Sequence, residues 1–419
     1  MTVRNLDYLF HPRSIAVIAE PEEAAHYAEV VRANLSAAGF PGDVRVDSAK
    51  KPAFFRLGAG MQIDDLPQAP DLAIVCAALD HVPSIVAQLA SRGTRAALVG
   101  PWRWHRMTGS QIQAARQAIL AAAQPSLLRV LGPGSGGLAV PARGLNASAS
   151  PVPIRAGKIA LVSQSTAVTA AILDHASSRE IGFSTVVHLG TSLDVDLADV
   201  LDWLASDPET RSIVVHFDAL PDGRKFMTAA RAAARHKPVV CIRSQRVGGG
   251  PPTASEVDDA ALRRAGWVRI ETLADVFDAV EAMAHARPML GERLLIVANG
   301  HGLGQLAADT LLRRGGQLGE LSSEVSSRLR ELLPTRSRPA NPLALPADAV
   351  PETWGTALET LLGDSGSDAV LTVCSPSPFA PGAAVAAAIC QAARDSDRNV
   401  FTCWVGGSGM RDALEHAAS

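Results

Sequence analysis

Short apolar segments alternate with longer amphipathic segments along most of the chain. Three of the apolar segments, Ser14–Ile18, Lys158–Val162 and Arg293–Val297, each lead through a small or polar loop into a segment rich in Ala and Leu. A buried strand, a tight loop and a helix produce this pattern. Repeated alternation of strand and helix is typical of parallel, doubly wound sheets. We therefore expect an α/β fold with three doubly wound units.

Breaks in this pattern divide the chain into three domain-sized parts. Residues 144–157 and 286–291 are rich in small residues and Pro, and both predict linkers. The predicted domains are residues 1–143, 151–287 and 291–419. A long Pro-rich loop is expected over residues 334–351. The last helical segment, Gly409–Ala418, lacks a Gly or Pro stop signal, so we expect a longer polypeptide or a partner chain beyond it.

The loops between strand and helix carry the first indication of function. Ser163-Gln164-Ser165 follows one of the three strands, and Asn299-Gly300-His301-Gly302 follows another. A helix N-terminus presents free backbone N–H groups and a positive dipole end, which favour a bound anion such as phosphate. We expect the two loops to form a phosphate cradle. The alternative at the first loop is that its Ser residues only cap the helix from Ala167.

Composition narrows the class of protein. The chain has 419 residues, of which 47% are hydrophobic and 19% charged. Its net charge is −3, and it has no run of basic residues long enough to bind a nucleic-acid backbone. No apolar run approaches the roughly 20 residues that span a bilayer, and the first residues lack a secretory signal. The 5 Cys residues show no metal spacing. We expect a cytoplasmic protein that binds no metal, no nucleic acid and no membrane.

Several motifs, each weak alone, together resemble the NDP-forming acyl-CoA synthetases, relatives of the succinyl-CoA synthetase α-subunit. The motifs are Leu6-Asp-x-Leu-Phe-x-Pro-x-Ser-Ile-Ala-Val-Ile, Leu131-Gly-Pro, Gly144-Leu-Asn-Ala-Ser, Gly157-Lys-Ile-Ala-Leu-Val-Ser-Gln-Ser, Ile181-Gly-Phe-Ser, Leu189-Gly-x-Ser-Leu-Asp-Val-Asp and Asn341-Pro-Leu. The resemblance covers essentially the whole chain. It implies a CoA-binding Rossmann domain followed by two ligase-like, flavodoxin-like domains.

Within that superfamily, two further segments are most similar to the synthetase-like region of bacterial protein lysine acetyltransferases. They are Ser148-Ala-Ser-Pro-Val-Pro-Ile and Ala286-Arg-Pro-Met-Leu-Gly-Glu-Arg-Leu. Those proteins fuse this region to an ATP-grasp unit and a GNAT acetyltransferase domain. The resemblance therefore implies an ATP-grasp or GNAT partner chain, and we also expect a homo-oligomer.

The resemblance implies CoA or an acyl-CoA as the ligand. The implied CoA-binding residues are Ala19, Pro133, Gly134 and Ser135. It also implies a phosphorylated histidine after the strand Val239–Ile242, held between the Ser163 and Asn299 loops. An imidazole suits this task because its neutral ring nitrogen is nucleophilic near neutral pH. Here Pro251-Pro252-Thr253 stands in that loop without a histidine, which predicts that the phospho-enzyme route is blocked.

Other departures from the family indicate a degenerate catalytic centre on an intact scaffold. Glu20, Glu22 and Glu23 follow the first strand at a positive helix end, where they would repel a CoA pyrophosphate. Asp218 stands where the family carries a glutamate that orients the imidazole, and its side chain is one methylene shorter. His301, in the third-domain loop, is the other weak candidate for a catalytic residue.

Four residues have simpler structural interpretations. His188 and His216 end strand-like segments and are expected at structural or rim positions. Asp194 and Asp196 alternate in the manner of Mg²⁺ ligands, yet acidic residues in this place also start a helix, which is the interpretation we favour.

Two sets of loop residues suggest nucleotide contacts on weaker grounds. The glycines of residues 132–137 resemble a dinucleotide fingerprint, but no convincing helix follows them, which argues against nicotinamide binding. Trp102 and Trp104 flank Arg103, and their rings either stack on adenine or line an interface. The sequence leaves this second choice open.

The first functional hypothesis is therefore an acyl-CoA-synthetase-like module without autonomous activity. It would bind CoA or acyl-CoA weakly, or have lost this ligand, and regulate or scaffold protein acetylation or acyl-CoA metabolism. The alternative is the α-type subunit of an ADP-forming acyl-CoA synthetase, an acid–thiol ligase, that acts with a separate ATP-grasp subunit. A third hypothesis is an interaction protein that binds no such ligand.

Overall fold

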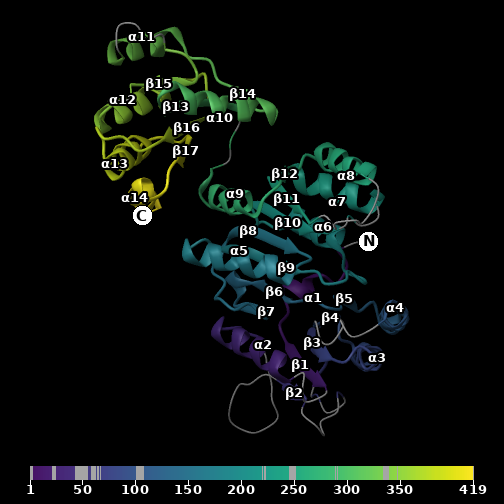
Figure 1. Cartoon of the computed structure of the whole chain (residues 1–419). Helices are drawn as coiled ribbons and strands as arrows, with labels where there is room; N and C mark the ends of the chain where they lie inside the picture. Colours follow the sequence, from purple (N-terminus) through teal and green to yellow (C-terminus); the bar gives the residue numbers. More distant parts are fainter. Residues whose placement is uncertain are drawn as a thin grey trace. The chain divides into compact units, whose positions relative to one another are not determined.

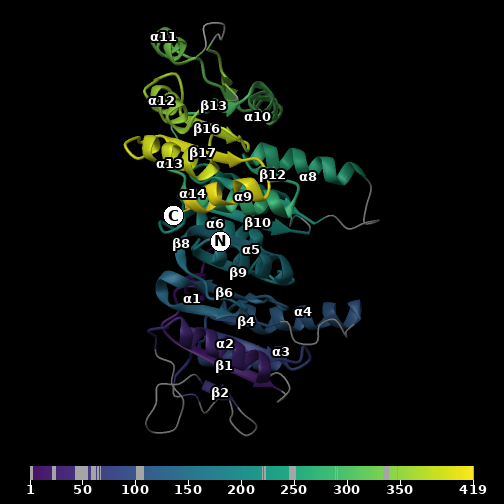
Figure 2. The same cartoon turned by 60° about the vertical axis from the view of Figure 1, so that its left-hand side comes forward.

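The computed structural model divides the chain into two compact units, Met1–Ala284 and His285–Ser419. It describes residues 3–20, 25–42, 55–57, 63, 66, 68–100, 108–218, 220, 223–244, 252–287, 289, 291–333, 339–346 and 348–418. The unit boundary lies next to the linker expected at residues 286–291. Figures 1 and 2 show the helices and strands of each unit. The α/β class with several parallel sheets is confirmed.

The first sheet of the first unit is parallel, with the strand order β2-β1-β3-β4-β5. Its strands are β1 (Ile15–Glu20), β2 (Phe55–Leu57), β3 (Leu72–Ala77), β4 (Ala96–Val99) and β5 (Arg129–Leu131). Helices α1 (Asp7–Phe10) and α2 (Ala25–Ala37) cover one face, and α3 (Val82–Arg92) and α4 (Gly109–Ala123) cover the other. Successive residues of β1 enter opposite cores, as in any buried strand. The sequence also predicts a strand near residues 44–47, and these residues lie outside the described part of the chain.

The second sheet has the order β12-β11-β10-β8-β9-β6-β7. Its strands are β6 (Gly137–Val140), β7 (Leu145–Ser148), β8 (Ala156–Ser163), β9 (Phe183–His188), β10 (Ser212–Phe217), β11 (Val239–Arg243) and β12 (Val268–Ile270). The strands from β12 to β9 are parallel, and β6 is antiparallel to both neighbours. Helices α5 (Thr166–Ser178) and α9 (Leu273–His285) cover one face. Helices α6 (Leu197–Ser206), α7 (Gly223–Ala234) and α8 (Pro252–Ala265) cover the other.

The linker expected at residues 144–157 is wrong over its first half, because Leu145–Ser148 forms strand β7. Gly144 turns the chain with a φ of +67°, and Leu145 and Ala147 then enter the core fully buried. The polar residues that alternate with them, Asn146 and Ser148, bond to each other, since the Ser148 hydroxyl donates to Asn146 Oδ1 at 2.6 Å. Apolar and polar residues therefore alternate with the period of a strand, although the small and polar composition of the segment indicated a loop. The β6–β7 hairpin joins the chain after the first sheet to the second sheet.

The second unit contains a parallel sheet of order β14-β13-β16-β17, with β15 also paired to β13. The strands are β13 (Arg293–Asn299), β14 (Gln317–Leu318), β15 (Leu343–Leu345), β16 (Ala369–Cys374) and β17 (Asn399–Trp404). Helix α10 (His301–Arg313) covers one face. Helices α11 (Ser323–Leu332), α12 (Pro351–Leu362), α13 (Gly382–Ala393) and α14 (Arg411–Ala418) cover the other. Strand β15 interrupts the expected Pro-rich loop, because the Asn341 amide bonds Leu294 O and Gly319 O and so fixes the chain beside β13.

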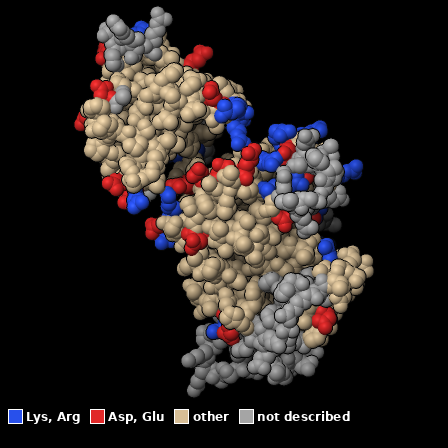
Figure 3. Space-filling view, in the orientation of Figure 1, with Lys and Arg blue, Asp and Glu red and all other residues tan. Residues whose placement is uncertain are grey.

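Two further observations concern the charged side chains and the lengths of the helices. Among the described residues on the face shown in Figure 3, acidic and basic side chains are interspersed. Within the described part of the chain, no helix combines the length and the apolar character needed to cross a bilayer.

Candidate functional site at the strand ends of the second sheet

Four parallel strands end side by side at one edge of the second sheet, and their last residues form a polar cluster. Ser163 ends β8, His188 ends β9, His216 lies near the end of β10, and Ser244 follows β11. In the strand register, Ser163 is paired with both His188 and His216. The carboxyl edge of a parallel sheet is where doubly wound folds bind their ligands. We call Ser163, His188, His216, Asp218 and Ser244 the strand-end cluster.

The loop after β8 is held by its own hydrogen bonds. Ser165 Oγ accepts the N–H of Val168 at 3.3 Å and caps helix α5. Ser163 Oγ donates to Ser165 O and accepts the Ser165 N–H, both at 3.0 Å. Gln164 Oε1 accepts the N–H of Asp218 at 2.8 Å. The capping role of Ser165 is confirmed, and the first-turn N–H groups of α5 still lack intrahelical partners, so the anion site at this loop stays a prediction.

His216 connects two serines through its two ring nitrogens. Its Nδ1 lies 3.2 Å from Ser163 Oγ, and its Nε2 lies 2.7 Å from Ser244 Oγ. The side chain is 1% exposed, and Asp218 Oδ1 lies 3.9 Å from Nε2. Burial lowers the pKa of His216, although the Asp218 carboxylate acts in the opposite direction. A neutral imidazole from another strand thus contacts the loop that the resemblance assigns to the phosphoimidazole.

His188 is the second buried imidazole of the cluster. The backbone N–H of Gly136 donates to its Nδ1 at 2.8 Å, so Nδ1 is the acceptor and Nε2 carries the proton. Its Nε2 is buried without a hydrogen-bond partner among the described residues. Burial lowers the pKa of His188 to about 4, and His216 contributes to this shift. Backbone groups of His188 and Gln164 raise the pKa, but by less.

His188 makes the stability of the first unit depend on pH. Its folded pKa of about 4 lies below the ordinary value of 6.5, so the folded state resists protonation. The stability that depends on a neutral His188 is therefore fully present above the ordinary pKa of 6.5. It is lost as the pH falls towards the folded pKa of about 4. We expect the free energy of unfolding to fall by about 3 kcal/mol from this residue alone between about pH 7 and pH 4.

Chemical denaturation across this pH range measures the effect. His188→Asn keeps an acceptor for the Gly136 N–H and should show a shallower pH dependence than the natural chain. His236→Asn, at an exposed position, is the matched control and should leave the dependence unchanged. Equal pH dependence in the natural chain and in His188→Asn would refute the assignment.

The residues expected to bind CoA lie at the carboxyl edge of the first sheet. Ala19 is paired with Cys76 near the end of β1. Gly134 and Ser135 belong to the turn after β5, where their N–H groups donate to Gly100 O at 3.2 Å and Val99 O at 3.1 Å. The turn also includes Pro133. The structure therefore brings these residues to one edge, and their contact with CoA stays a prediction.

Ser135 connects this edge to the strand-end cluster. It is fully buried, and its hydroxyl donates to His188 O and accepts the N–H of Gly137 at 3.0 Å. The hydroxyl of Tyr27, on α2, donates to Ser135 O at 3.3 Å. The Ser135 side chain is thus hydrogen-bonded inside the protein. Among the described residues, a Cβ placed on Gly134 would meet only Thr191 Cγ2, at 3.9 Å. Gly134 is the member of the turn with open space beside it.

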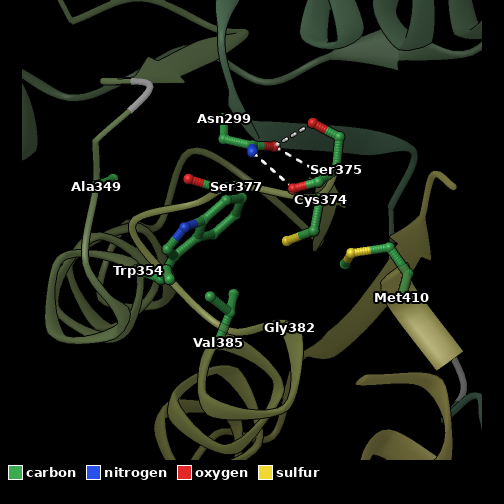
Figure 4. Close-up of a pocket in the computed structure, with 10 residues that line it drawn as sticks. Asn299, Ala349, Trp354, Cys374, Ser375, Ser377, Gly382, Val385 and Met410 are labelled. Carbon is green, nitrogen blue, oxygen red and sulfur yellow. Dashed lines mark hydrogen bonds between the residues drawn. The ribbon is translucent and has the colours of Figure 1, made fainter. Parts of the chain in front are cut away.

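The third-domain loop lies in the second unit, at the end of β13. Gly300 precedes α10 with a φ of +97°, and no side chain of the described residues caps this helix. The Asn299 amide donates to Ser375 O and accepts the Ser375 N–H, both at 2.9 Å (Figure 4). His301 and Gly302 are exposed in the first turn of α10. Asn299 is therefore a framework residue, and Gly300 and Gly302 remain predicted contributors to an anion site.

A small cavity lies next to Asn299, between β16 and the helices of one sheet face. Trp354, Cys374, Val385 and Met410 contribute its apolar walls (Figure 4). Its volume is about 10 Å³, which suits a single water molecule. Burial raises the pKa of the Cys374 thiol. The cavity therefore has no room for an acyl group.

Asp194 and Asp196 bind cationic side chains and backbone groups. Asp196 caps α6 by accepting the N–H of Asp199 at 2.9 Å, which confirms the helix-start interpretation for this residue. Asp194 Oδ2 accepts from Arg129 Nε at 2.9 Å and from the N–H of Val130 at 2.8 Å. Within the described ranges, no group of three or more His, Cys, Asp or Glu is arranged to hold a metal ion.

Several predicted residues lie outside the described part of the chain. They are Glu22, Glu23, Trp102, Arg103, Trp104 and Pro251, together with the side chains of Glu20, Pro252 and Thr253. The sequence analysis does not single out Ser244, and it assigns structural or rim positions to His188 and His216. A signal existed, since all three lie at the ends of parallel strands that the pattern had identified.

Comparison with known proteins identifies relatives of nearly the whole chain. Residues 156–283 match the family described as "Succinyl-CoA ligase like flavodoxin domain". Acetate–CoA ligase [ADP-forming] I of Archaeoglobus fulgidus is 27% identical over 97% of this chain. Acetate–CoA ligase [ADP-forming] II subunit alpha of Pyrococcus furiosus is 26% identical over 90% of it. The comparisons support the NDP-forming acyl-CoA synthetase family.

The extent of each match limits what it implies. This chain spans 59% of the length of the Archaeoglobus enzyme but 83% of the Pyrococcus alpha subunit. The dinucleotide forming acetyl-coenzyme A synthetase 1 of Candidatus Korarchaeum cryptofilum, solved with phosphate and ADP, has a TM-score of 0.85. That match covers 99% of this chain and 92% of the other at 24% identity, and so it supports the fold. The link to lysine acetyltransferases is without support from these relatives.

Proposed function

We propose that this chain is the α-type component of an ADP-forming acyl-CoA synthetase and acts with an ATP-grasp partner. The match to the Pyrococcus alpha subunit, which extends over 83% of that subunit, carries the proposal. This is the alternative that the sequence left open. The regulatory role in protein acetylation has no comparable support.

In this proposal the carboxyl edges of the first and second sheets bind different groups. CoA binds at the carboxyl edge of the first sheet, where the open side of Gly134 admits a ligand close to the backbone. The acyl or phosphate group binds at the Ser163 loop, where the positive end of α5 stabilises its negative charge. Ser135 donates to His188 O and thereby fixes the position of one edge relative to the other.

Titration with CoA tests the first part of the proposal. Gly134→Ala adds a methyl group at the open side of the turn, at a φ of +77°, and should weaken CoA binding about tenfold or more. Gly39→Ala is the matched control, because Gly39 has a φ of +71° and no atom of the described residues lies within 4 Å of the added Cβ. It carries a similar backbone strain and should bind CoA like the natural chain. Calorimetry that detects no CoA binding by the natural chain would reject the proposal.

The carrier of the phosphoryl group is the open part of the mechanism. Residues 237–284 contain no histidine, so the family's phosphohistidine has no counterpart in that segment. His301, exposed in the first turn of α10, is the candidate carrier in the second unit. Incubation with labelled ATP and the ATP-grasp partner should give an acid-labile label that disappears in His301→Ala. Label that persists in this variant would exclude His301.

The absence of histidine from residues 237–284 favours one second candidate function. A chain that binds CoA or acyl-CoA without accepting phosphate would act as a non-catalytic CoA-binding module. Retained CoA binding without any acid-labile label would select this function over the synthetase component.

A further inference from the structure

We propose that Ser244 is a nucleophile that accepts an acyl group from an acyl-CoA, with His216 as its general base and Ser163 as the residue that positions the base. The inference rests on the proposed function, which supplies the acyl-CoA. A serine hydroxyl and a base within hydrogen-bond reach, with the base oriented by a third group, form the arrangement that activates a nucleophile.

The hydrogen bonds determine which ring nitrogen of His216 is the base. Ser163 has one hydroxyl proton, and it donates this proton to Ser165 O at 3.0 Å. Ser163 Oγ can therefore only accept from the imidazole, so the proton of neutral His216 lies on Nδ1. This leaves a lone pair on Nε2, and the Ser244 hydroxyl donates to it at 2.7 Å. The imidazole is in the tautomer that removes a proton from Ser244.

Ser244 is exposed and His216 is buried, as expected for a nucleophile that meets substrate and a base that is held behind it. Ser244 is exposed, and its backbone is fixed because its N–H donates to Phe217 O at 3.1 Å. His216 is buried behind it, with 1% of its side chain exposed, so the ring keeps its orientation. The Ser163 loop that positions the ring also begins α5, whose free N–H groups favour negative charge on a reacting carbonyl oxygen.

The acylation step balances without another reactant. Ser244 Oγ attacks the thioester carbonyl carbon while its proton moves to His216 Nε2. An oxygen–carbon bond forms, the carbon–sulfur bond breaks, and the proton passes from Nε2 to the departing CoA sulfur. The products are an O-acyl serine and free CoA.

Acidification should slow the reaction, because His216 must be neutral to accept a proton. Burial lowers the pKa of His216, so the rate should be at its plateau at neutral pH and should fall only below the ordinary value of 6.5. Asp218, which follows β10, raises this pKa. His188, at the end of β9, interacts electrostatically with the same ring.

Two acyl donors test the inference on the full chain. Acetyl-CoA should release free CoA and leave one acetyl group on the peptide that contains Ser244, as seen by mass spectrometry. The small ester p-nitrophenyl acetate should acetylate the same serine without requiring a CoA site. If the ester labels Ser244 but CoA and acetyl-CoA do not bind, the proposed function fails and the nucleophile stands. If acetyl-CoA binds but neither donor labels Ser244, the nucleophile is rejected.

Variants separate the nucleophile from its base and from the positioning residue. Ser244→Ala should abolish labelling, whereas Ser244→Cys should restore an acyl acceptor. Ser178→Ala is the matched control, because Ser178 is exposed and its hydroxyl donates only to the backbone of its own helix, at His175 O. His216→Gln should slow acylation by about a hundredfold or more.

Ser163→Ala should displace the pH profile as well as lower the rate, because the Nδ1 proton loses its acceptor. Labelling of equal extent in the natural chain and in Ser244→Ala would overturn the inference. An unchanged pH profile in Ser163→Ala would remove Ser163 from its positioning role.

Discussion

Replacing Arg129 by methionine is expected to lower the free energy of unfolding of the first unit by about 3–5 kcal/mol. Arg129, on β5, is 13% exposed and binds Asp194 at 2.9 Å and Asp199 at 3.0 Å near the start of α6. Asp199 is 1% exposed, and burial raises its pKa while Arg129 and Lys225 lower it. Methionine would keep the apolar stem but leave a buried carboxylate with Lys225 as its remaining cation.

Thermal and chemical denaturation measure this loss. Arg155→Met is the control, because the Arg155–Glu180 pair is 54% and 76% exposed and a pair in water contributes at most about 1 kcal/mol. A difference of less than about 1 kcal/mol between the two variants would show that the cluster adds nothing beyond a surface pair. The expected large difference would make Arg129 a principal connection between the first sheet and the helices of the second.

The regular parts of the fold could be predicted because each apolar run is short and bounded by turn residues. Strands such as Leu72–Ala77 are buried on both faces, so their sequences are apolar throughout. Strand Ser212–Phe217 is equally buried and is apolar between Ser212 and His216. The hairpin of β6 and β7 could not be predicted in this way. Its residues alternate between the core and a mutually bonded Asn146–Ser148 pair, and that pair becomes visible only when the hairpin is folded.

The candidate site was predictable in position but only partly in chemistry. Ser163 and its neighbours could be placed at a strand end because loop and helix signals are local. The partnership of His216 with Ser244 could not, since 28 residues separate them and the order of the strands decides which ends meet. From the sequence alone, a histidine at the end of a buried strand is interpreted as structural. Its role depends on the hydroxyls that neighbouring strands supply.

The turn at residues 132–137 emerges as the connection between the two sites. Ser135 donates to His188 O, and Gly136 donates to His188 Nδ1. The same turn carries Gly134, the residue with open space for CoA. A change that moves this turn should therefore affect both the first-sheet edge and the strand-end cluster, even without touching a ligand.

Gly137→Ala is expected to be the most damaging single-methyl change in this turn. Gly137 has a φ of +112°, which side chains rarely adopt, and an added Cβ would lie 2.3 Å from Ala147 O and from the Ser148 Cα. Both obstacles are backbone atoms of β7, so neither can rotate away. Strain and overpacking each cost about 1–3 kcal/mol, and we expect a combined loss of about 3–5 kcal/mol.

Gly39→Ala again serves as the control, since it combines a positive φ with open space and should lose only the strain energy of about 1–2 kcal/mol. Comparison of the two unfolding curves isolates the clash with β7. The folded fraction of Gly137→Ala should also show a smaller acid response from His188, because displacement of the turn at Gly136 exposes the imidazole and relieves the burial that lowers its pKa. Equal stability of the two variants would mean that β7 yields to the methyl group, and the hairpin would then not be the rigid support on which the positions of Ser135 and His188 depend.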